Sequence, residues 1–534
     1  MLNQEAIFDY IIVGAGSSGC VLANRLSENP AHRVLLIECG PDDKSPLIRM
    51  PRGVGKLLDP KNPHVFAYQV TPAGNQPEEI WLKGKAIGGS SSVNGMVYMR
   101  GSPQDYDDWE KSGCTGWGWD RIGRHFVALE DHVLGPAEWR GTGGPLKISQ
   151  HHADNPVTNA MLEAAREMGV PTVPDVNDVA VVADQGMGHQ VTTTWKGERF
   201  SAARAFIDPI RGRPNLTILT GKRVERVLFE GKRVSGVLVD GETIRCRGEV
   251  ILSAGAVESP KLLELSGIGD AQRLQALGIE TLAHSPGVGE NLREHRYVAL
   301  DWRIAGHSSN QKLQGLGLLR SVLRYFLFRK GAMTDAAHEV GGFIKTEACL
   351  DRPDAQVGSM MVTMKQDATG KVMLDTYPGM RLLGYFTRPQ SKGSTHAASR
   401  DPAVLPVMNA NHFAEDVDRQ RALHLFKWIR RSGQQNALAP WIIEETGFGA
   451  DIHTDDEILA NLLKLGGTSF HIAGTAAMGA DARDVLDPQL RVRGVEGLRV
   501  CDTSIMPTLV SGNTNAPAMA IAMNAADIIL SNKS

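Results

Sequence analysis

Short apolar runs separated by glycine-rich turns predict a parallel sheet in the first part of the chain. Residues 8–13 are nearly all apolar, as expected for a strand buried on both faces, and residues 33–37 repeat this pattern. A helical pattern lies between them at residues 20–27. A further apolar strand at residues 250–253 leads into a helix at 259–265, and we expect this strand to lie beside the first one.

Four short apolar segments precede that last strand. Turn signals at Glu230-Gly231 and Asp240-Gly241 separate some of them, so we expect a β-meander. The segments cover residues 216–219, 224–229, 234–239 and 243–245.

Residues 318–330 predict a helix with an apolar face and a basic face. Large apolar side chains alternate there with four cations, which are Arg320, Arg324, Arg329 and Lys330. Such a helix either covers a domain or lies on a membrane surface. We favour the first interpretation, because one short basic helix is weak evidence for a membrane.

Composition and charge narrow the class of protein. At 534 residues the chain exceeds the size at which one core stops growing, so we expect two domains. The net charge of −3 argues against a nucleic-acid partner, and no apolar stretch has the length of a membrane span. The six cysteines are scattered, so we expect free thiols in a reducing compartment and no metal site. No signal-like leader is visible, and we expect a cytoplasmic protein.

A glycine-rich turn after the first strand has the pattern of a dinucleotide-binding fingerprint. Gly14, Gly16 and Gly19 lie between strand and helix, and the second strand ends in Glu38, nineteen residues after Gly19. The glycines allow a tight turn and a close approach of backbone to a pyrophosphate, while the acid binds ribose hydroxyls. The fingerprint does not separate NAD from FAD, but Glu38 disfavours a 2′-phosphate.

Two further motifs resemble the signatures of the glucose–methanol–choline (GMC) oxidoreductases. The first is Gly-Lys-Ala-Ile-Gly-Gly-Ser-Ser-Ser-Val-Asn-Gly at residues 84–95, and the second is the segment from Gly255 to Gly269. The resemblance extends over essentially the whole chain. It implies an FAD whose isoalloxazine ring lies along residues 88–97, with Asn94 at its polar edge. Val93 stands where some relatives attach FAD through a histidine, so the resemblance implies noncovalent FAD.

The resemblance and the fingerprint together give a set of cofactor-binding residues. The expected residues are Gly14, Gly16, Ser17, Ser18, Gly19, Glu38, Phe66, Gly89, Ser90, Asn94, Gly95, Met96, Val97, Val224, Ala254, Asp502, Asn515 and Pro517.

His471 and Asn515, near the end of the chain, form the predicted catalytic pair. Asn515 follows a loop of small polar residues and precedes an apolar helical run with Pro517 in its first turn, so we interpret it as a helix N-cap. Histidine suits a general base because its pKa lies near neutral pH. Asn515 would donate to the developing alkoxide, and the helix N-terminus would stabilise the reduced ring. Phe470 resembles a gate residue of the family, and Glu339 is a weaker candidate for the substrate cavity.

These observations predict an FAD-dependent oxidoreductase that converts a primary alcohol, of benzylic, furanic or allylic type, to its aldehyde. Either O2 or a quinone or electron carrier would accept the electrons. A hydroxynitrile lyase, which has the same fold without redox chemistry, is the alternative function. A binding or scaffold protein with an inactive catalytic site is the third possibility. The oligomeric state is not indicated.

The expected fold is α/β, or α+β overall, with two interleaved domains. A Rossmann-like FAD-binding domain would comprise residues 1–155, 200–295 and 466–534. A substrate domain built on an antiparallel sheet would comprise residues 156–199 and 296–465.

Overall fold

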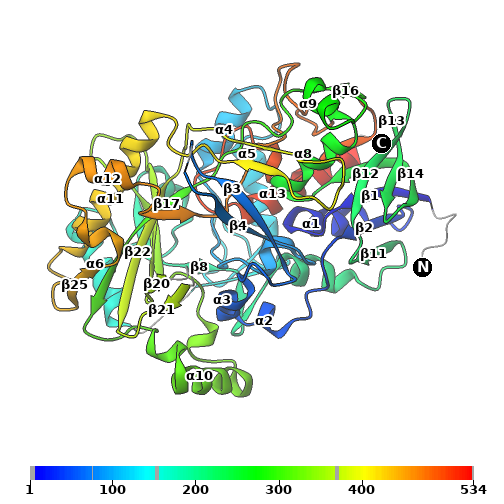
Figure 1. The fold of residues 1–534 in the computed structure, drawn as a ribbon. Coiled ribbons are helices and arrows are strands. Elements are labelled where there is room, and N and C mark those ends of the chain that lie inside the picture. Colours follow the sequence, from blue (N-terminus) through cyan, green and yellow to red (C-terminus); the bar gives the residue numbers. More distant parts are fainter. Residues whose placement is uncertain (1–6, 75, 151–154, 367–371, 532–534) are drawn as a thin grey trace.

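The computed structural model describes residues 7–74, 76–150, 155–366 and 372–531. Its first sheet is built on parallel strands (Figure 1). β1 (Ile7–Val13) lies between β2 (Val34–Glu38) and β14 (Glu242–Leu252), and all three run parallel. α1 (Ser17–Leu26) connects β1 to β2 as predicted. The β1–α1–β2 unit therefore has the geometry that the fingerprint requires.

The middle segments differ from the expected four-stranded meander. β11 (Leu216–Thr220) pairs in parallel with β2 and so extends the parallel sheet instead. The segments at 243–245 and 250–253 form a single strand, β14, whose first half pairs with β13 (Arg233–Val239) and whose second half pairs with β1. β12 (Val224–Glu230) completes the meander. One long strand thus joins the parallel strands and the antiparallel meander within a single sheet. Apolar patterning alone does not reveal this, because Cys246 and Val250 flank a polar interval.

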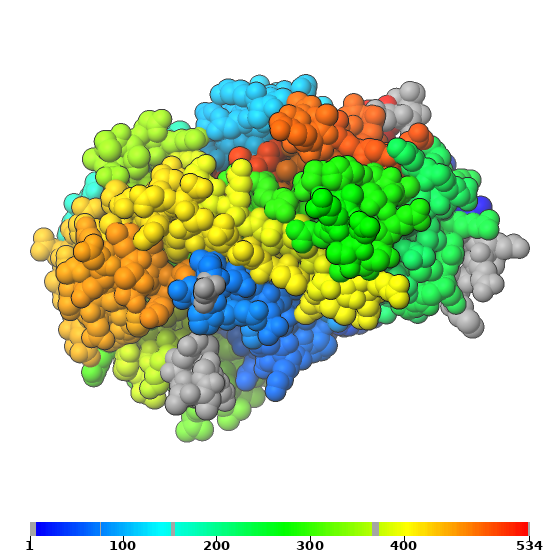
Figure 2. All heavy atoms as spheres, turned by 45° about the horizontal axis from the view of Figure 1, so that its top comes forward, coloured from blue at the N-terminus to red at the C-terminus, as the bar shows by residue number. Residues whose placement is uncertain are grey.

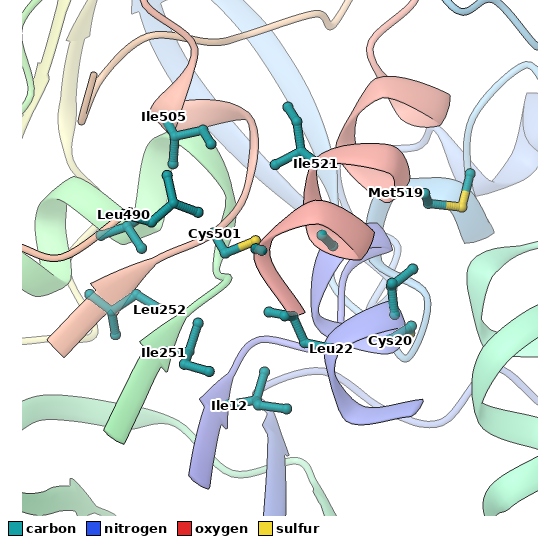
Figure 3. Close-up of a cluster of buried hydrophobic side chains, with 14 of the residues drawn as sticks. Ile12, Cys20, Leu22, Ile251, Leu252, Leu490, Cys501, Ile505, Met519 and Ile521 are labelled. Carbon is teal, nitrogen blue, oxygen red and sulfur yellow. The ribbon is translucent and has the colours of Figure 1, made fainter. Parts of the chain in front are cut away.

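Two helices cover one face of the parallel sheet. α1 packs against α13 (Asn515–Ser531), and Figure 3 shows Leu22 of α1 near Ile12 of β1, with Ile251 and Leu252 of β14 alongside and Ile521 of α13 farther along the same apolar cluster. All five side chains are buried. β27 (Leu498–Val500) pairs with β14, so the chain returns to this sheet just before α13 begins.

A second sheet is antiparallel, as expected for the substrate domain. Its strand order is β25-β17-β22-β19-β18-β7, and β26 pairs with β17. α11 (Asp416–Gly433) packs on β17 and β22. The strands are β7 (Gly186–His189), β17 (Arg296–Ile304), β18 (Val340–Ile344), β19 (Ala355–Met360), β22 (Gly379–Phe386), β25 (Ile442–Thr446) and β26 (Gly466–Thr468).

Residues near 390–410 connect the two halves. On the face shown in Figure 2, this yellow segment runs from the orange part of the molecule to the green part. β24 (Val407–Asn409) pairs with β3 (Val65–Thr71), and β3 pairs with β4 (Glu79–Gly84). The remaining elements used below are α2 (Pro46–Arg49), α3 (Val54–Leu57), α6 (Pro156–Glu167), α8 (Gly255–Leu265), β20 (Met364–Gln366), β21 (Val372–Leu374) and η2 (Gly89–Ser92).

The predicted basic helix is α10 (Gly315–Phe328), which projects from the bottom of the molecule in Figure 1. Within the described ranges, no helix combines the length and the apolar character that crossing a bilayer requires. No disulfide joins the six cysteines, all of which lie in the part of the chain that the structure describes.

Candidate active site

One large cavity of about 1270 Å³ connects the two sheets. One end lies at the glycine turn after β1, and the other is lined by the antiparallel sheet and α10. Pockets for small ligands typically measure about 300–1,000 Å³, so this cavity has room for a dinucleotide together with a substrate.

Glycine geometry shapes the nucleotide end. Gly14 has φ +99°, and a Cβ there would lie 2.5 Å from the Ser253 carbonyl oxygen. A Cβ on Gly89 would lie 2.6 Å from Gly16 Cα. The motif at residues 84–95 and the glycine-rich turn after β1 therefore touch through their backbones. A Cβ on Gly19 would overlap the Gly14 carbonyl. The glycines therefore allow backbone packing that any other residue would prevent.

Glu38 lines the cavity and also fixes the turn. Its carboxylate accepts hydrogen bonds from the N–H groups of Ala15 at 2.9 Å and Gly40 at 2.8 Å. Burial raises the pKa of Glu38, and these two N–H groups partly offset that shift. These two contacts hold the acid in the cavity beside the turn that precedes α1.

Asn94 is oriented by its neighbours. Its side-chain oxygen accepts from the Met96 N–H at 3.1 Å and from Arg199 Nη1 at 2.7 Å, which leaves its amide nitrogen as the remaining donor toward the cavity. Arg199 is fully buried, and burial lowers its pKa to about 9.

Most of the predicted cofactor residues line the cavity. Those that do are Gly14, Gly16, Ser17, Ser18, Glu38, Phe66, Gly89, Ser90, Asn94, Gly95, Met96, Val97, Val224, Ala254, Asp502 and Asn515. Gly19 and Pro517 are not among the lining residues: Gly19 packs beneath Gly14, and Pro517 is buried within α13. The Asp502 carboxylate accepts from the Gly255 N–H and the Ser259 hydroxyl, so it also holds the start of α8.

The structure gives His471 a different partner from the expected one. His471 Nε2 lies 3.0 Å from Nδ2 of Asn513, two residues before the predicted Asn515. The Asn515 side-chain oxygen instead accepts from the Ser17 hydroxyl at 2.7 Å. Asn515 is the first residue of α13 rather than its cap, because the Thr514 carbonyl already accepts from the Ala518 N–H. The loop residue Asn513 is therefore the one that faces the imidazole.

A chain of hydrogen bonds fixes which nitrogen of His471 carries the proton. The Thr387 carbonyl can only accept, so His295 donates to it from Nε2, at 2.9 Å. A neutral His295 then has a bare Nδ1, which accepts from Nδ1–H of His471 at 3.0 Å. Nε2 of a neutral His471 is consequently left with its lone pair toward the cavity.

The orientation of Asn513 is set in the same way. The Tyr385 hydroxyl donates to Oε1 of Gln356 at 2.7 Å, and Nε2 of Gln356 donates to Oδ1 of Asn513 at 3.0 Å. Asn513 must therefore present its amide N–H to His471. Tyr385 also stacks on His295, with ring centroids 4.4 Å apart. Sequence reasoning missed Asn513, Gln356 and Tyr385, although the pair of asparagines in Gly-Asn-Thr-Asn was the available signal for Asn513.

Burial keeps both histidines neutral. Desolvation lowers the pKa of His295 to about 3, and it holds the pKa of His471 well below its usual 6.5, with Lys83 and His338 adding to the effect. The His471 backbone N–H donates to Glu294 at 2.9 Å, and burial raises the pKa of that carboxyl. The lowered pKa values of the two histidines agree with the neutral forms that the hydrogen bonds require.

The two substrate candidates have different positions. Phe470 lines the cavity next to His471, and its backbone adopts φ +62°, a strained conformation that the Lys83 ammonium helps to hold by donating to its carbonyl. Glu339 does not line the cavity, because its carboxylate is turned toward α6 and accepts from the Thr158 hydroxyl at 2.6 Å. The structure therefore does not bring Glu339 to the cavity surface, and its role at the substrate stays a prediction.

A parallel nucleotide-binding sheet, a glycine-rich turn and an imidazole that line one cavity indicate a dinucleotide-dependent oxidoreductase. The chain matches the GMC oxidoreductase family over residues 8–297 and 389–522, and it belongs to that family. It is an enzyme that acts on CH–OH donors with FAD as its cofactor.

Similar proteins agree with this assignment. An alcohol dehydrogenase [acceptor] of Pseudomonas putida is 37% identical over 98% of this chain and 96% of its own. The mitochondrial choline dehydrogenase of Homo sapiens is 37% identical over 98% and 89%. The crystal structure of pyridoxine 4-oxidase from Mesorbium loti superposes with a TM-score of 0.86 at 30% identity, covering 97% of this chain and 98% of that one.

Proposed function

We propose that this enzyme oxidises a neutral, largely apolar primary alcohol to its aldehyde. The observation that carries the proposal is the bare Nε2 of His471 beside the Asn513 amide, at the end of a cavity whose substrate wall has no carboxylate.

His471 acts as the base in this proposal. An alcohol oxygen that replaces the direct contact between the two side chains accepts from Asn513 Nδ2 and donates its proton to His471 Nε2. The resulting imidazolium keeps its Nδ1–H on His295, and the amide of Asn513 stabilises the alkoxide. When bound, FAD supplies the acceptor for the hydride that leaves the alcohol carbon, which balances the reaction to aldehyde and one proton.

The start of α13 contributes a further electrostatic effect. Thr514, Asn515 and Ala518 all line the cavity, so the N-terminus of a 17-residue helix opens onto it. A helix N-terminus carries partial positive charge and favours an anion. Val93 also lines the cavity and offers no nucleophile, which supports noncovalent attachment of the cofactor.

The substrate wall indicates the kind of alcohol. Among its described lining residues between 297 and 385 there is no acid, and the cation Arg381 is paired with Asp301 at 2.6 Å. Apolar side chains such as Met360, Val362 and Leu383 supply much of this surface. A quaternary ammonium alcohol would find no counter-charge there, whereas a benzylic, allylic or aliphatic alcohol would bury its chain favourably.

An anaerobic mixing experiment tests the proposal. Benzyl alcohol and 1-octanol should bleach the flavin absorbance, and choline should do so far more slowly at equal concentration. A lyase would leave the flavin oxidised with every alcohol. A second mixing of the reduced enzyme with air or with a quinone then identifies the acceptor. Fast bleaching by choline alone would contradict the proposed substrate class.

A further inference from the structure

The helix α10 carries an apolar face that the described residues leave uncovered. Leu316, Leu323 and Leu327 are 85%, 53% and 70% exposed, and Leu319 and Phe328 are exposed as well. Leu316, Leu319, Leu323 and Leu327 recur at helical spacing, so they form one stripe. Tyr325 is the one residue of α10 that is buried in the described structure. A stripe of this size seldom faces water on a soluble protein.

Basic side chains accompany this stripe. Lys312, Arg320, Arg324, Arg329 and Lys330 lie in or near α10, and the sequence has no acid between Asp301 and Asp335. Arg329 contacts Glu198, but the ion pairs found between described residues include none of Arg320, Arg324 and Lys330. An apolar face bordered by cations is complementary to a surface that is both apolar and negatively charged.

The inner side of α10 forms part of the cavity. Leu318, Val322 and Phe326 line it together with Met333 and Met373. In Figure 1, α10 lies below β20, β21 and the α2–α3 segment, which also contribute lining residues. The helix with the exposed stripe is thus also a wall of the substrate end.

We propose that α10 binds the surface of an anionic phospholipid bilayer and places this end of the cavity against the lipid. A water-insoluble alcohol would then pass from the bilayer into the cavity; this second step rests on the proposed function. A second copy of the chain is the competing occupant of the stripe. Pairing α10 with itself would bring Arg320 and Arg324 close to their own copies without an acid on the helix to compensate, which favours the membrane.

Vesicle sedimentation tests the docking step. The FAD-loaded enzyme should sediment with vesicles of phosphatidylcholine and phosphatidylglycerol in equal amounts, weakly with phosphatidylcholine alone, and less as salt is raised. Changing both Leu319→Glu and Leu327→Glu should reduce the bound fraction about tenfold or more. Ile443→Glu with Val407→Glu is the matched control, because these residues are 56% and 66% exposed outside α10. The control should bind like the parent enzyme.

Several outcomes would overturn the docking proposal. Failure of the parent enzyme to sediment with anionic vesicles at low salt would do so, as would equal loss of binding in the control. A dimer in sedimentation velocity that the Leu319/Leu327 variant alone abolishes, with no vesicle binding, would assign the stripe to a second copy.

Activity assays separate this proposal from the proposed function. Oxidation of soluble benzyl alcohol should be unchanged in the Leu319/Leu327 variant, whereas oxidation of a long-chain alcohol carried in anionic vesicles should fall about tenfold. If no alcohol reduces the parent enzyme, the proposed function fails while vesicle binding still decides the role of α10. Equal rates on the vesicle-borne alcohol would exclude delivery through the lipid.

Discussion

The two ends of the cavity are built by different means. The nucleotide end is mostly backbone, with Gly14, Gly16 and Gly89 packed so closely that no Cβ fits at two of these positions. The catalytic end is a side-chain network that includes His471, Asn513 and His295, held by residues far apart in the sequence. Binding surfaces made of glycine backbone tolerate little substitution, so they can be recognised in a sequence as short motifs. Side-chain hydrogen-bond networks depend instead on packing between distant parts of the chain.

The largest effect should come from removing the base. His471→Ala should lower kcat/KM by about a hundred- to ten-thousandfold, because proton transfer by a positioned side chain contributes that much. The flavin content should remain that of the parent enzyme, since the nucleotide end is untouched. Steady-state kinetics and the visible spectrum provide the two readouts. Unchanged turnover would refute the assignment of the base.

The next largest effect should come from disturbing the glycine packing at the nucleotide end of the cavity. Gly14→Ala should weaken FAD binding by about tenfold or more, since φ +99° is strained for alanine and its Cβ would press on the Ser253 carbonyl. Gly212→Ala is the control, because its Cβ would meet no atom within 4 Å. FAD bound per chain after gel filtration gives the measurement. Equal occupancy in both variants would show that this glycine packing is not required.

The hydrogen bonds that link Thr387, His295 and His471 predict how a substitution changes the pH dependence of activity. The base must be unprotonated, so activity is lost as pH falls through the pKa of His471, which burial holds well below 6.5. His295→Phe keeps an aromatic ring against Tyr385 but removes the neutral acceptor for the Nδ1–H of His471, which stabilises the imidazolium. The acid limb of kcat/KM should therefore move to still lower pH, and the plateau should fall about tenfold. A pH profile of kcat/KM with the same acid limb and the same plateau as the parent enzyme would contradict this hydrogen-bond arrangement.

The smallest effect is expected at Glu339. Glu339→Gln should leave kcat/KM for every alcohol within about twofold, because the carboxylate contacts Thr158 and the glutamine oxygen can still accept from it. Substrate profiles of the variant and the parent enzyme test this. A selective loss of activity on cationic alcohols would restore Glu339 to the substrate site.

What could be predicted from the sequence follows the same division. The β1–α1–β2 unit was predictable because local spacing determines it. Most of the other residues that line the nucleotide end were named through the family resemblance, and their contact with the cofactor stays a prediction. β11 was misplaced because an apolar segment does not reveal which strand it pairs with.

At the catalytic end, a shift of two residues decided the partner of His471. Asn513 and Asn515 are chemically identical in the sequence, and only the start of α13 shows which one lies in the loop. Gln356 and Tyr385 come from separate strands of the antiparallel sheet, so their role depends on tertiary packing that no local pattern encodes.

The comparison of Asn513→Ala with Asn515→Ala tests the central claim most directly. The rate of anaerobic flavin bleaching by a primary alcohol should fall about a hundred- to a thousandfold in Asn513→Ala, because the donor to the alkoxide is lost. Asn515→Ala should retain most of the rate, since its side chain contacts Ser17 rather than His471. A severe loss in Asn515→Ala with a nearly normal rate in Asn513→Ala would contradict the account.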